Sequence, residues 1–534
     1  MRPAMRSVRR SVLRPVLAAG LAAMLASALV GCAVLDGRAG AVNAVRDGPL
    51  PAATQRALAA AGVPPQALAA VMLPLAHRAP AWGRRAAQPM APGSTMKLVT
   101  SVVALDRLGP GHRGQTTFTT HAPLAADGVL QGDLRLAGGA DPDLGLAAFW
   151  ALLVDLRAAG VQRIAGDLVI DRQFFHPARA DLGVPPFDGG PEWPYNVIPD
   201  ALGLAGALLP VEIDSRSGAV VARTVPPLAG ITVQARMGVV ERRCADWEDD
   251  WQPPRVLPDA AAAAAPAGLT IELHGSFPRD CVRRLALQAG DRLRLDEAIF
   301  RTLWSGLGGT LDGRVREAAE RVPALAPAPR VLAQRHARPW GEVLRRMNKV
   351  SDNAQTRLLY LAIGAAQELT PAGAAASANT QRTPTATLAE HTVRQWFAEH
   401  AIATPGLVLD NGSGLSRSER ITPLALARLL QVAWAGRHAS DFIASLPLAG
   451  EDGTMRARLK GSPAAGWARL KTGTLRDVAA LAGYVRDAHG RPWAVAMMIN
   501  DERARAARPA LDALVDALAR SEQPGVWGAP SAEP

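Results

Sequence analysis

The chain has 534 residues, of which 49% are hydrophobic and 20% are charged, so it can bury large cores and is not a disordered protein. Its length favours two to four domains. The formal net charge of +11 is not gathered into basic stripes and no nucleic-acid-binding module is recognisable, which excludes a nucleic-acid partner.

The first 31 residues have the pattern of an export signal. The basic stretch MRPAMRSVRRSVLR contains five arginines and no acidic residue, and the apolar run PVLAAGLAAMLASALV follows it. This length and these flanks are typical of a signal peptide rather than of a membrane-spanning helix. Without the five arginines a net charge of about +6 remains, which suits work near anionic envelope polymers.

The segment LVGC at 29–32 resembles a bacterial lipobox, in which Cys32 becomes the lipidated first residue of the mature chain. We therefore expect a signal peptide over residues 1–31, a tether over 32–45 and a lipid anchor that holds the protein at a membrane in the periplasm. Ala33 follows the cysteine where an aspartate would be expected for inner-membrane retention. By resemblance to bacterial lipoproteins, this favours the outer membrane.

The residues after the tether predict a strand, a loop and a helix. ALAAVMLPLA at 67–76 is typical of a strand, and PMAPGSTMKLVTSVVALDRLG at 89–109 of a loop that leads into a helix starting near Pro92. The apolar stripe of this helix consists of Met96, Val99, Val102, Val103 and Leu105. Ser94 and Lys97 are spaced i and i+3, so their side chains should stand together.

The sequence pattern changes between residues 118 and 288, where short strand-like runs alternate with turns. The clearest runs lie at 129–139, 163–171, 231–243 and 269–277, with one helix near 146–160. We expect an inserted, mostly β region over 118–288, with the alanine tract at 260–268 as a surface loop.

The cysteines and histidines favour a disulfide and no metal site. Besides Cys32, the chain contains Cys244 and Cys281, and an even pair in an exported protein favours a disulfide. Two buried free thiols remain the alternative. There is no C-x-x-C or H-E-x-x-H pattern and the ten histidines are scattered, so no structural zinc or metalloprotease site is expected.

Helical character returns after 288. Residues 296–307 predict a helix, 339–364 predict two helices around a short motif, and 364–387 predict a loop. Three strand-like runs at 467–475, 479–487 and 492–500 predict an antiparallel meander, and 509–522 predicts an amphipathic closing helix. One core domain is thus expected from two sequence halves, 46–117 and 289–522, followed by a tail over 523–534.

Three short motifs point to one chemistry. S-x-x-K lies at Ser94–Lys97, S-D-N at Ser351–Asn353 and K-T-G at Lys471–Gly473. Each is weak alone, but here they occur in order and in their expected contexts: opening a helix, between two helices, and on a strand before the last helix. The set resembles the penicillin-recognising acyl-serine transferases, that is, penicillin-binding proteins and serine β-lactamases.

Further stretches narrow the resemblance. MNKVSDN, DNGSGLSR at 410–417, GTMRARLKGSPAAGWARLKTGTL at 453–475 and LAGGADPDL at 136–144 are similar to the D-alanyl-D-alanine carboxypeptidase/endopeptidase family of low-molecular-mass class C penicillin-binding proteins. Ser94 and Ser351 are 257 positions apart, which fits the long insert of that family and not the shorter gap of β-lactamases. The resemblance implies an α/β (α+β) fold: a transpeptidase core with an antiparallel sheet flanked by helices, a helical subdomain and a large β-rich insert.

The resemblance also implies roles for the first two motifs. Ser94 would be the nucleophile, which needs an adjacent base because a hydroxyl is weak at its ordinary pKa. Lys97 would be that base if burial and the second lysine lower its pKa, although which group takes the proton is left open. Ser351 would relay the proton to the leaving D-alanine nitrogen, and Asn353 would hold the substrate amide.

The third motif would bind the substrate. Lys471 would supply positive charge near the terminal carboxylate, and Thr472 and Thr474 would donate hydroxyl hydrogen bonds beside Gly473. The backbone N–H groups of Ser94 and Thr474 would form the oxyanion hole.

The implied function is hydrolysis of peptidoglycan stem peptides ending in D-Ala-D-Ala, and of cross-links, through an acyl-enzyme that penicillin would also form. No metal or organic cofactor is needed. Two alternatives stay open. A β-lactamase or esterase could use the same core, but no E-x-x-L-N-like segment follows S-D-N. A non-catalytic envelope scaffold is the other, against which the intact motifs argue.

Only four of the 59 basic Lys and Arg residues are lysines, and all four lie in the motif stretches. Arginine cannot give up its proton in a protein, whereas a buried lysine can, so Lys97 and Lys471 are the positions where arginine would fail. Lys349 and Lys460 are interpreted as packed or surface charges and Asp352 as structural. The EWPY cluster at 192–195 is interpreted as buried packing in preference to a surface that stacks on sugar or peptide.

Overall fold

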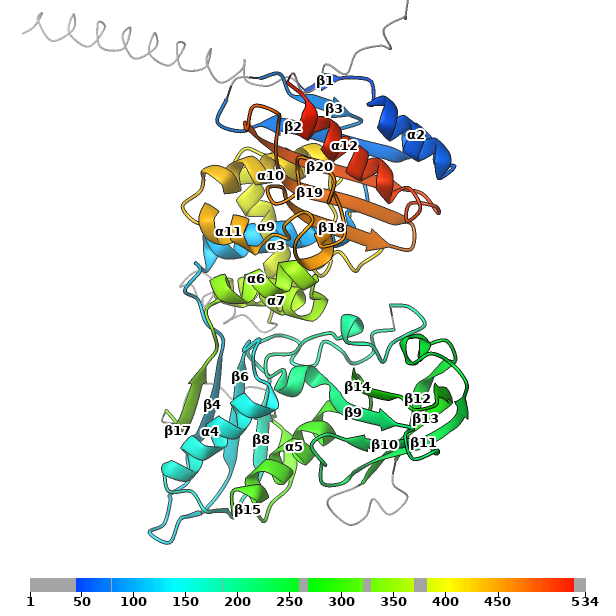
Figure 1. Cartoon of the computed structure of the whole chain (residues 1–534). Helices are drawn as coiled ribbons and strands as arrows, with labels where there is room; N and C mark the ends of the chain where they lie inside the picture. The colour runs from blue at the N-terminus through cyan, green and yellow to red at the C-terminus, as the bar shows by residue number, and fades with distance from the viewer. Residues whose placement is uncertain are drawn as a thin grey trace, which may run out of the picture.

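The computed structural model describes residues 45–77, 79–185, 187–258, 268–319, 328–368 and 382–522. The expected signal peptide, Cys32 and most of the tether lie outside the described residues, as do most of the alanine tract and most of the loop expected at 364–387. The described chain forms two lobes (Figure 1). We call residues 45–107 and 340–522 the core, and residues 115–336 the insert. Within the described residues, no helix is long and apolar enough to span a bilayer.

The core is built on a six-stranded sheet with strand order β1-β3-β2-β20-β19-β18. The strands are β1 (Arg46–Asp47), β2 (Leu68–Pro74), β3 (Trp82–Arg84), β18 (Arg469–Leu475), β19 (Val478–Arg486) and β20 (Pro492–Asn500). β18, β19 and β20 pair antiparallel in sequence order, so the predicted meander is confirmed, and β2 from the first half of the chain joins β20.

Alternate residues of β2 face two different helical layers, because side chains of a strand point to opposite faces. Leu68 and Met72 pack with α2 (Ala52–Ala60) and α12 (Arg508–Arg520). Val71 and Leu73 pack into the apolar core on the other face of the sheet. The helices on this side are α3 (Lys97–Arg107), α6 (Trp340–Val350), α7 (Asn353–Glu368), α9 (Thr385–Glu399), α10 (Pro423–Ala435) and α11 (Ala439–Ser445). Covering both faces explains why every residue of β2 is buried.

The described residues of the insert form four small sheets. Their strand orders are β16-β8-β6-β4-β17, β15-β7-β5, β10-β9-β14 and β11-β13-β12. The strands are β4 (Gln115–Thr120), β5 (Val129–Leu130), β6 (Leu134–Gly139), β7 (Arg163–Ile164), β8 (Leu168–Asp171), β9 (Leu209–Asp214), β10 (Val221–Thr224), β11 (Ile231–Val240), β12 (Trp251–Pro258), β13 (Leu269–Pro278), β14 (Val282–Leu287), β15 (Thr310–Leu311), β16 (Val315–Glu317) and β17 (Arg330–His336). Two helices, α4 (Leu146–Ala158) and α5 (Arg292–Gly306), complete it.

The insert is longer than the 118–288 expected from the sequence. Phe300 of α5 packs against Phe118 and Phe149 in the insert's own apolar core, with ring centroids 6.3 and 6.5 Å away. β17 returns to pair antiparallel with β4. The expected start at residue 118 falls inside β4, and the expected end at residue 288 falls before α5 and β17, which also belong to the insert. The pattern of a helix such as α5 does not reveal which sheet the helix covers.

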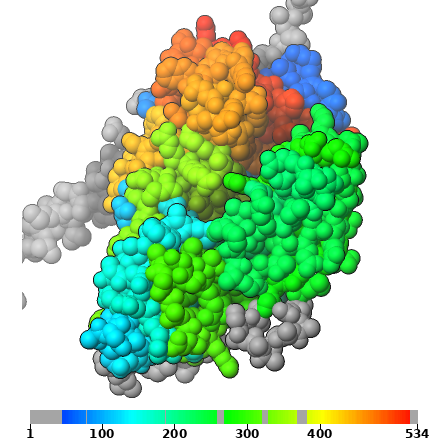
Figure 2. All heavy atoms as spheres, turned by 60° about the horizontal axis from the view of Figure 1, so that its bottom comes forward, coloured from blue at the N-terminus to red at the C-terminus, as the bar shows by residue number. Residues whose placement is uncertain are grey.

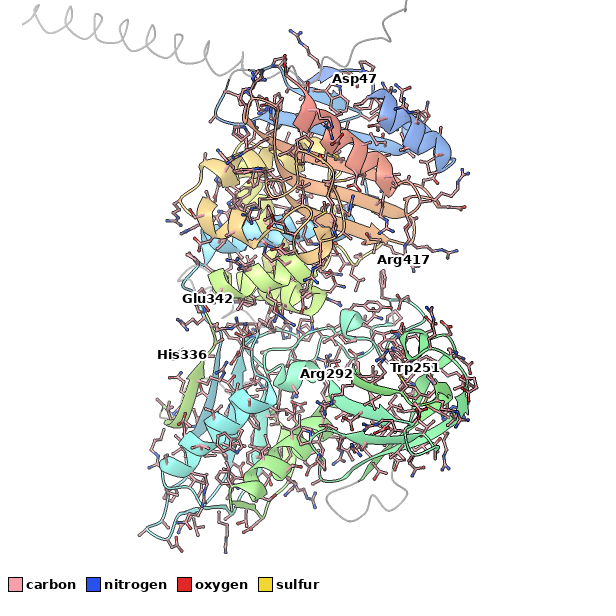
Figure 3. All side chains as sticks on the ribbon, in the orientation of Figure 1. Asp47, Trp251, Arg292, His336, Glu342 and Arg417 are labelled. Atoms are coloured by element: carbon pink, nitrogen blue, oxygen red, sulfur yellow. A yellow bond between two sulfur atoms is a disulfide. The ribbon has the colours of Figure 1, made fainter. Side chains whose placement is uncertain are left out.

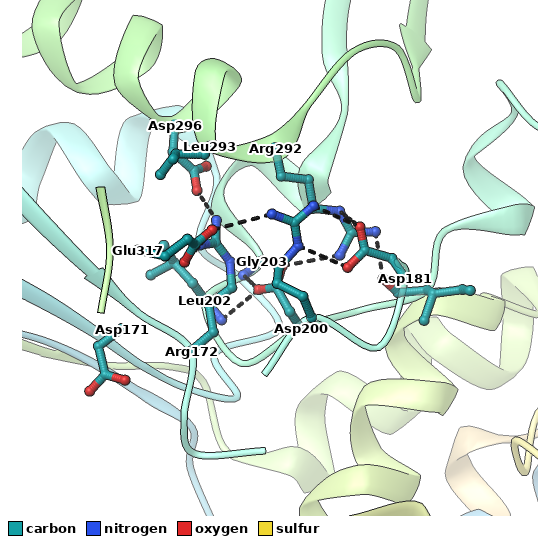
Figure 4. A network of polar contacts seen from close by, with 12 residues as sticks. Asp171, Arg172, Asp181, Asp200, Leu202, Gly203, Arg292, Leu293, Asp296 and Glu317 are labelled. Atoms are coloured by element: carbon teal, nitrogen blue, oxygen red, sulfur yellow. Dashed lines mark hydrogen bonds and ion pairs between the residues drawn. The ribbon is translucent and has the colours of Figure 1, made fainter. Parts of the chain in front are cut away.

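A buried ion network fixes the segment that leads from β8 towards the core (Figure 4). The fully buried guanidinium of Arg172 donates to Asp200 at 3.0 Å, to Glu317 at 2.6 Å and to Asp296. Arg292 of α5 also donates to Asp200, at 3.0 Å. Buried charges of both signs with full hydrogen bonding are tolerated where a lone charge would not be. The network thus ties β8, β16 and α5 to the chain that runs on to the active-site cleft.

Candidate active site

Ser94 and Lys97 lie side by side, as their spacing predicted. Ser94 is in the short 3-10 helix η2 (Gly93–Met96), and Lys97 is the first residue of α3. Lys97 Nζ donates a hydrogen bond to Ser94 Oγ at 3.0 Å. The lysine is fully buried, whereas Ser94 is half-buried and lines a cleft, so the hydroxyl is reachable from outside and its partner amine is not.

Lys97 is held by two further acceptors. Its Nζ donates to Asn353 Oδ1 at 2.6 Å and to the backbone oxygen of Ser413 at 2.5 Å. Burial lowers the pKa of Lys97 to about 7, against the opposing charges of Glu419 and Asp352, which raise it. Near neutral pH a large fraction of Lys97 is therefore uncharged and able to accept a proton from the Ser94 hydroxyl.

The S-D-N motif lies where α6 ends and α7 begins. Ser351 has a φ of 62°, in the left-handed region that a residue with a side chain adopts only where its surroundings hold it there. This conformation ends α6 and allows Asn353 to start α7. Asp352 Oδ1 accepts from the backbone N–H of Gln355 at 2.9 Å, a structural contact of the kind expected for that residue.

The K-T-G motif lies on β18. Lys471 is fully buried, and its Nζ donates to Ser351 Oγ at 2.8 Å and to the backbone oxygen of Thr472 at 2.9 Å. Burial and the nearby charge of Lys97 hold the pKa of Lys471 well below its ordinary value. Thr472 Oγ1 donates to Thr454 Oγ1 at 2.9 Å. The three predicted motifs therefore meet around Ser94.

Gly473 allows β18 to approach η2 closely. A Cβ at this position would lie 2.3 Å from the backbone oxygen of Pro92 and 3.2 Å from the backbone nitrogen of Ser94. A Cβ at Gly93, whose φ is +50°, would lie 3.0 Å from the nitrogen of Thr474. The backbone N–H groups of Ser94 and Thr474 are thus brought to the same small space, as an oxyanion hole requires.

Both lobes line the cleft that opens at Ser94. Its volume is about 690 Å³, and the insert contributes Phe187, Asp188 and Tyr195. The core contributes Arg417, which Figure 3 labels where the core faces the insert. Its guanidinium lies 5.0 Å from the centre of the Phe187 ring. The insert also contacts the catalytic motif directly, because Asn353 Nδ2 donates to the backbone oxygen of Tyr195 at 3.1 Å. Figure 2 shows the green part of the insert bordering the core, with a hollow where they meet.

The turn DNGSGLS at 410–416 was given no predicted role, and the structure places it against Lys97. Besides the Ser413 oxygen, this region supplies Glu419, a fully buried carboxylate whose Oε1 accepts from the backbone N–H of Gly412 at 2.8 Å. Burial raises the pKa of Glu419 to about 7. A Cβ at Gly414 would lie 1.9 Å from the backbone oxygen of Gly93, so this turn packs tightly on η2. Nothing in the sequence marks Glu419, because a glutamate between serine and arginine is typical of an exposed loop.

The remaining candidate residues fall outside the catalytic cluster. Lys349 forms an ion pair with Asp452, and Lys460 is exposed, so both are the packed or surface charges expected. Cys244 and Cys281 form the predicted disulfide, with a Cα–Cα distance of 5.3 Å. The described part of the chain contains no cluster of His, Cys, Asp and Glu that could hold a metal ion.

Fold and site together define a serine hydrolase built like a penicillin-binding protein. The structure of penicillin-binding protein 4 (dacB) from Haemophilus influenzae matches with a TM-score of 0.67 at 22% sequence identity, covering 85% of this chain and 96% of that chain. The chain belongs to the D-Ala-D-Ala carboxypeptidase 3 (S13) family, whose sequence pattern matches residues 53–521.

Two curated relatives support this assignment. The D-alanyl-D-alanine carboxypeptidase of Actinomadura sp. (strain R39) is 30% identical over 424 residues, which cover 77% of this chain and 73% of the relative. D-alanyl-D-alanine carboxypeptidase DacB of Haemophilus influenzae is 25% identical over 430 residues, which cover 77% and 80%. The family, the fold class and the serine DD-peptidase class predicted from the motifs are thereby confirmed.

Proposed function

We propose that this enzyme removes the terminal D-alanine from peptidoglycan stem peptides, and cleaves the corresponding cross-links, through an acyl-enzyme on Ser94. The observation that carries the proposal is the 3.0 Å hydrogen bond between Lys97 Nζ and Ser94 Oγ. It joins a reachable hydroxyl to a buried amine whose pKa of about 7 suits a general base at neutral pH.

Acylation begins when the neutral amine of Lys97 takes the proton of Ser94 Oγ as this oxygen attacks the carbonyl carbon between the two D-alanines. The negative charge that develops on the carbonyl oxygen is stabilised by the backbone N–H groups of Ser94 and Thr474, at a site worth several kcal/mol of barrier in comparable enzymes. The C–N bond then breaks. The departing nitrogen receives a proton from Lys471 through Ser351 Oγ, to which Lys471 Nζ donates at 2.8 Å, and D-alanine leaves. The proton that Lys97 took from Ser94 then passes to the nearby Lys471, which leaves Lys97 neutral again.

Deacylation repeats the same chemistry with water as the nucleophile. Lys97 accepts a proton from the water that attacks the ester carbonyl, and Ser94 Oγ regains its proton as the ester bond breaks. Cleavage of a cross-link differs only in the leaving amine, which belongs to the side chain of a second stem peptide. The cleft, which both lobes line, has a volume of about 690 Å³ and leaves room for that second chain.

The substrate's terminal carboxylate would be received by the K-T-G strand. The pKa of Lys471 is lower than that of an ordinary lysine, so the amine loses its proton more readily. The substrate carboxylate would favour the protonated form of Lys471 when it binds. Thr472 and Thr474 provide hydroxyl donors beside it. This binding would orient the scissile carbonyl over Ser94. Holding the reacting groups in this position raises their effective concentration and so increases the rate.

Penicillin would react with Ser94 in the same way, but its leaving nitrogen stays attached to the acyl group and hinders deacylation. A structure of the Haemophilus influenzae penicillin-binding protein 4 complexed with a β-lactam supports this part of the proposal, as does the shared fold. A β-lactamase on this core is the alternative, and fast steady turnover of nitrocefin would favour it.

The location is also part of the proposal. The signal-like segment and Cys32 support a periplasmic enzyme that is attached to a membrane through an N-terminal lipid. Ala33, the residue after the cysteine, supports the outer membrane as its location. Replacement of Cys32 by serine should block lipid attachment and move the protein out of the membrane fraction. Unchanged fractionation would contradict the anchor and leave the catalytic proposal intact.

The activity is tested by incubating the mature chain with a synthetic pentapeptide that ends in D-Ala-D-Ala and measuring released D-alanine. We expect release by the wild type and none by Ser94→Ala. No release by either protein, with no penicillin adduct, would contradict the proposed function in favour of a scaffold.

A further inference from the structure

A second pocket opens beside the active-site cleft, entirely within the insert. Its volume is about 400 Å³. It shares Asp188, Gly189 and Tyr195 with the lining of the cleft at Ser94, so the two spaces adjoin. The rest of its lining includes the buried Glu192, the partly buried Trp193 and Trp251, and the exposed Glu248. The proposed mechanism makes no use of this pocket.

Three tryptophans form a rigid aromatic wall at this pocket. The ring centroids of Trp193 and Trp251 are 5.5 Å apart, and the buried Trp247 lies 6.0 and 5.5 Å from them. Trp193 and Trp251 are only partly buried and line the pocket, so part of each ring is available to a ligand. The disulfide Cys244–Cys281 ties the segment that carries Trp247 and Trp251 to the turn between β13 and β14. Figure 3 labels Trp251 in this β-rich part of the insert.

Glu192 brings an unused hydrogen-bond acceptor to this wall. Its side chain is only 4% exposed, and Oε1 accepts from Trp251 Nε1 at 2.8 Å. Oε2 is buried and has no hydrogen-bond partner among the described residues. A buried carboxylate oxygen without a donor costs free energy, so such groups in native proteins call for an explanation. A ligand that carries hydrogen-bond donors would supply one.

The charges of the lining restrict the ligand further. Asp188, Glu192 and Glu248 are acidic, and no lysine or arginine is among the described residues of the lining, so the pocket disfavours anions. Aromatic faces beside a carboxylate suit a ligand that has an apolar face and hydroxyl or amide donors at its edge, which is the chemistry of a pyranose ring.

We propose that this pocket is a carbohydrate subsite that binds an N-acetylated sugar of the glycan strand while the attached stem peptide occupies the cleft at Ser94. The sugar would stack on Trp251 and Trp193 and donate a hydroxyl hydrogen bond to Glu192 Oε2, with Glu248 at the rim. The inference rests on the proposed function, because only a peptidoglycan substrate carries glycan and stem peptide together. Its consequence is a preference for stem peptides that are still attached to sugar.

Calorimetric titration of the mature full-length chain with N,N′-diacetylchitobiose tests the subsite without any catalysis. We expect binding by the wild type and about tenfold weaker binding by Glu192→Gln, which loses the carboxylate charge and places an amide where the free acceptor was. Glu248→Gln removes a charge from an exposed rim position and should weaken binding by a smaller factor. Because this residue is exposed, its variant tests the subsite even if the buried Glu192→Gln fails to fold. Glu241→Gln is the matched control: Glu241 is exposed in the same insert and outside the pocket, and this variant should bind as the wild type does.

No binding by the wild type, or equal affinities in all four proteins, would overturn the subsite. Binding of lysine amide in place of the disaccharide would overturn it in favour of an amine site. The result is separable from the proposed function, which is tested by D-alanine release from a free pentapeptide. With both substrates in hand, the wild type should have a higher kcat/KM for the disaccharide-linked pentapeptide than for the free one, and Glu192→Gln should lose that ratio.

Discussion

Lys97 and Lys471 are both fully buried, and each donates a hydrogen bond to a different serine of the site: Lys97 to Ser94 at 3.0 Å and Lys471 to Ser351 at 2.8 Å. Burial lowers the pKa of both amines, and the charge of Lys97 lowers that of Lys471 further. Protonation of both amines at once is unfavourable, because two positive charges would repel each other in a buried site. The pair can therefore take a proton from Ser94 and return one through Ser351.

The rate of acylation by penicillin should rise with pH through about 7. Below the pKa of Lys97, the amine is protonated and cannot accept the Ser94 proton; above it, the amine is neutral and can. Stopped-flow measurement of the second-order acylation rate between about pH 5 and pH 9 would show this ascending limb. A rate that does not change over this range would contradict Lys97 as the base.

Glu419→Gln should move that ascending limb to lower pH. The negative charge of Glu419 raises the pKa of Lys97, so its removal lowers this pKa and leaves more neutral amine near pH 7, where part of Glu419 is ionised. Glutamine keeps one oxygen for the backbone N–H of Gly412. Glu342→Gln, at an exposed position of α6, is the control and should leave the profile in place. A limb that moves to higher pH in Glu419→Gln would contradict the electrostatic assignment.

Lys97→Arg should lose about 10²-fold to 10⁴-fold in acylation rate, the usual contribution of a general base. Arginine keeps the positive charge but cannot release its proton, so charge alone does not rescue the reaction. Lys460→Arg changes an exposed lysine and should acylate at the wild-type rate. The two variants are compared by labelling with fluorescent penicillin over time. Equal labelling would mean that Lys97 serves only as a charge.

Gly473→Ala should lower the acylation rate by about 10²-fold to 10³-fold, the cost of losing an oxyanion-hole donor. The new Cβ would lie 2.3 Å from the backbone oxygen of Pro92, so β18 must move away from η2 and take the N–H of Thr474 with it. Gly461→Ala is the matched control, because a Cβ there meets no atom within 4 Å. If Gly473→Ala retained the wild-type acylation rate, the close approach of β18 to η2 would have no part in catalysis.

The sequence could predict those parts of the site that depend on local spacing. Ser94 and Lys97 are one helical turn apart, and the meander of β18, β19 and β20 follows from three strand-like runs in succession. Lysine usage in an arginine-rich chain also marked Lys97 and Lys471.

Long-range contacts could not be predicted in this way. Glu419 comes near Lys97 only through the tertiary packing of its turn on η2, and the contact of the Tyr195 oxygen with Asn353 joins residues 158 positions apart. The insert ends at β17 because this strand pairs with β4, more than two hundred positions earlier, and the pattern of β17 alone does not specify that partner.

The most direct test of the central claim is the intact mass of the mature chain after exposure to benzylpenicillin, measured beside Ser94→Ala. We expect a mass gain of one penicilloyl group in the wild type and none in the variant. An adduct that persists in Ser94→Ala would place the nucleophile elsewhere. The absence of any adduct in the wild type, with or without rapid penicillin turnover, would contradict a slowly deacylating acyl-enzyme on Ser94.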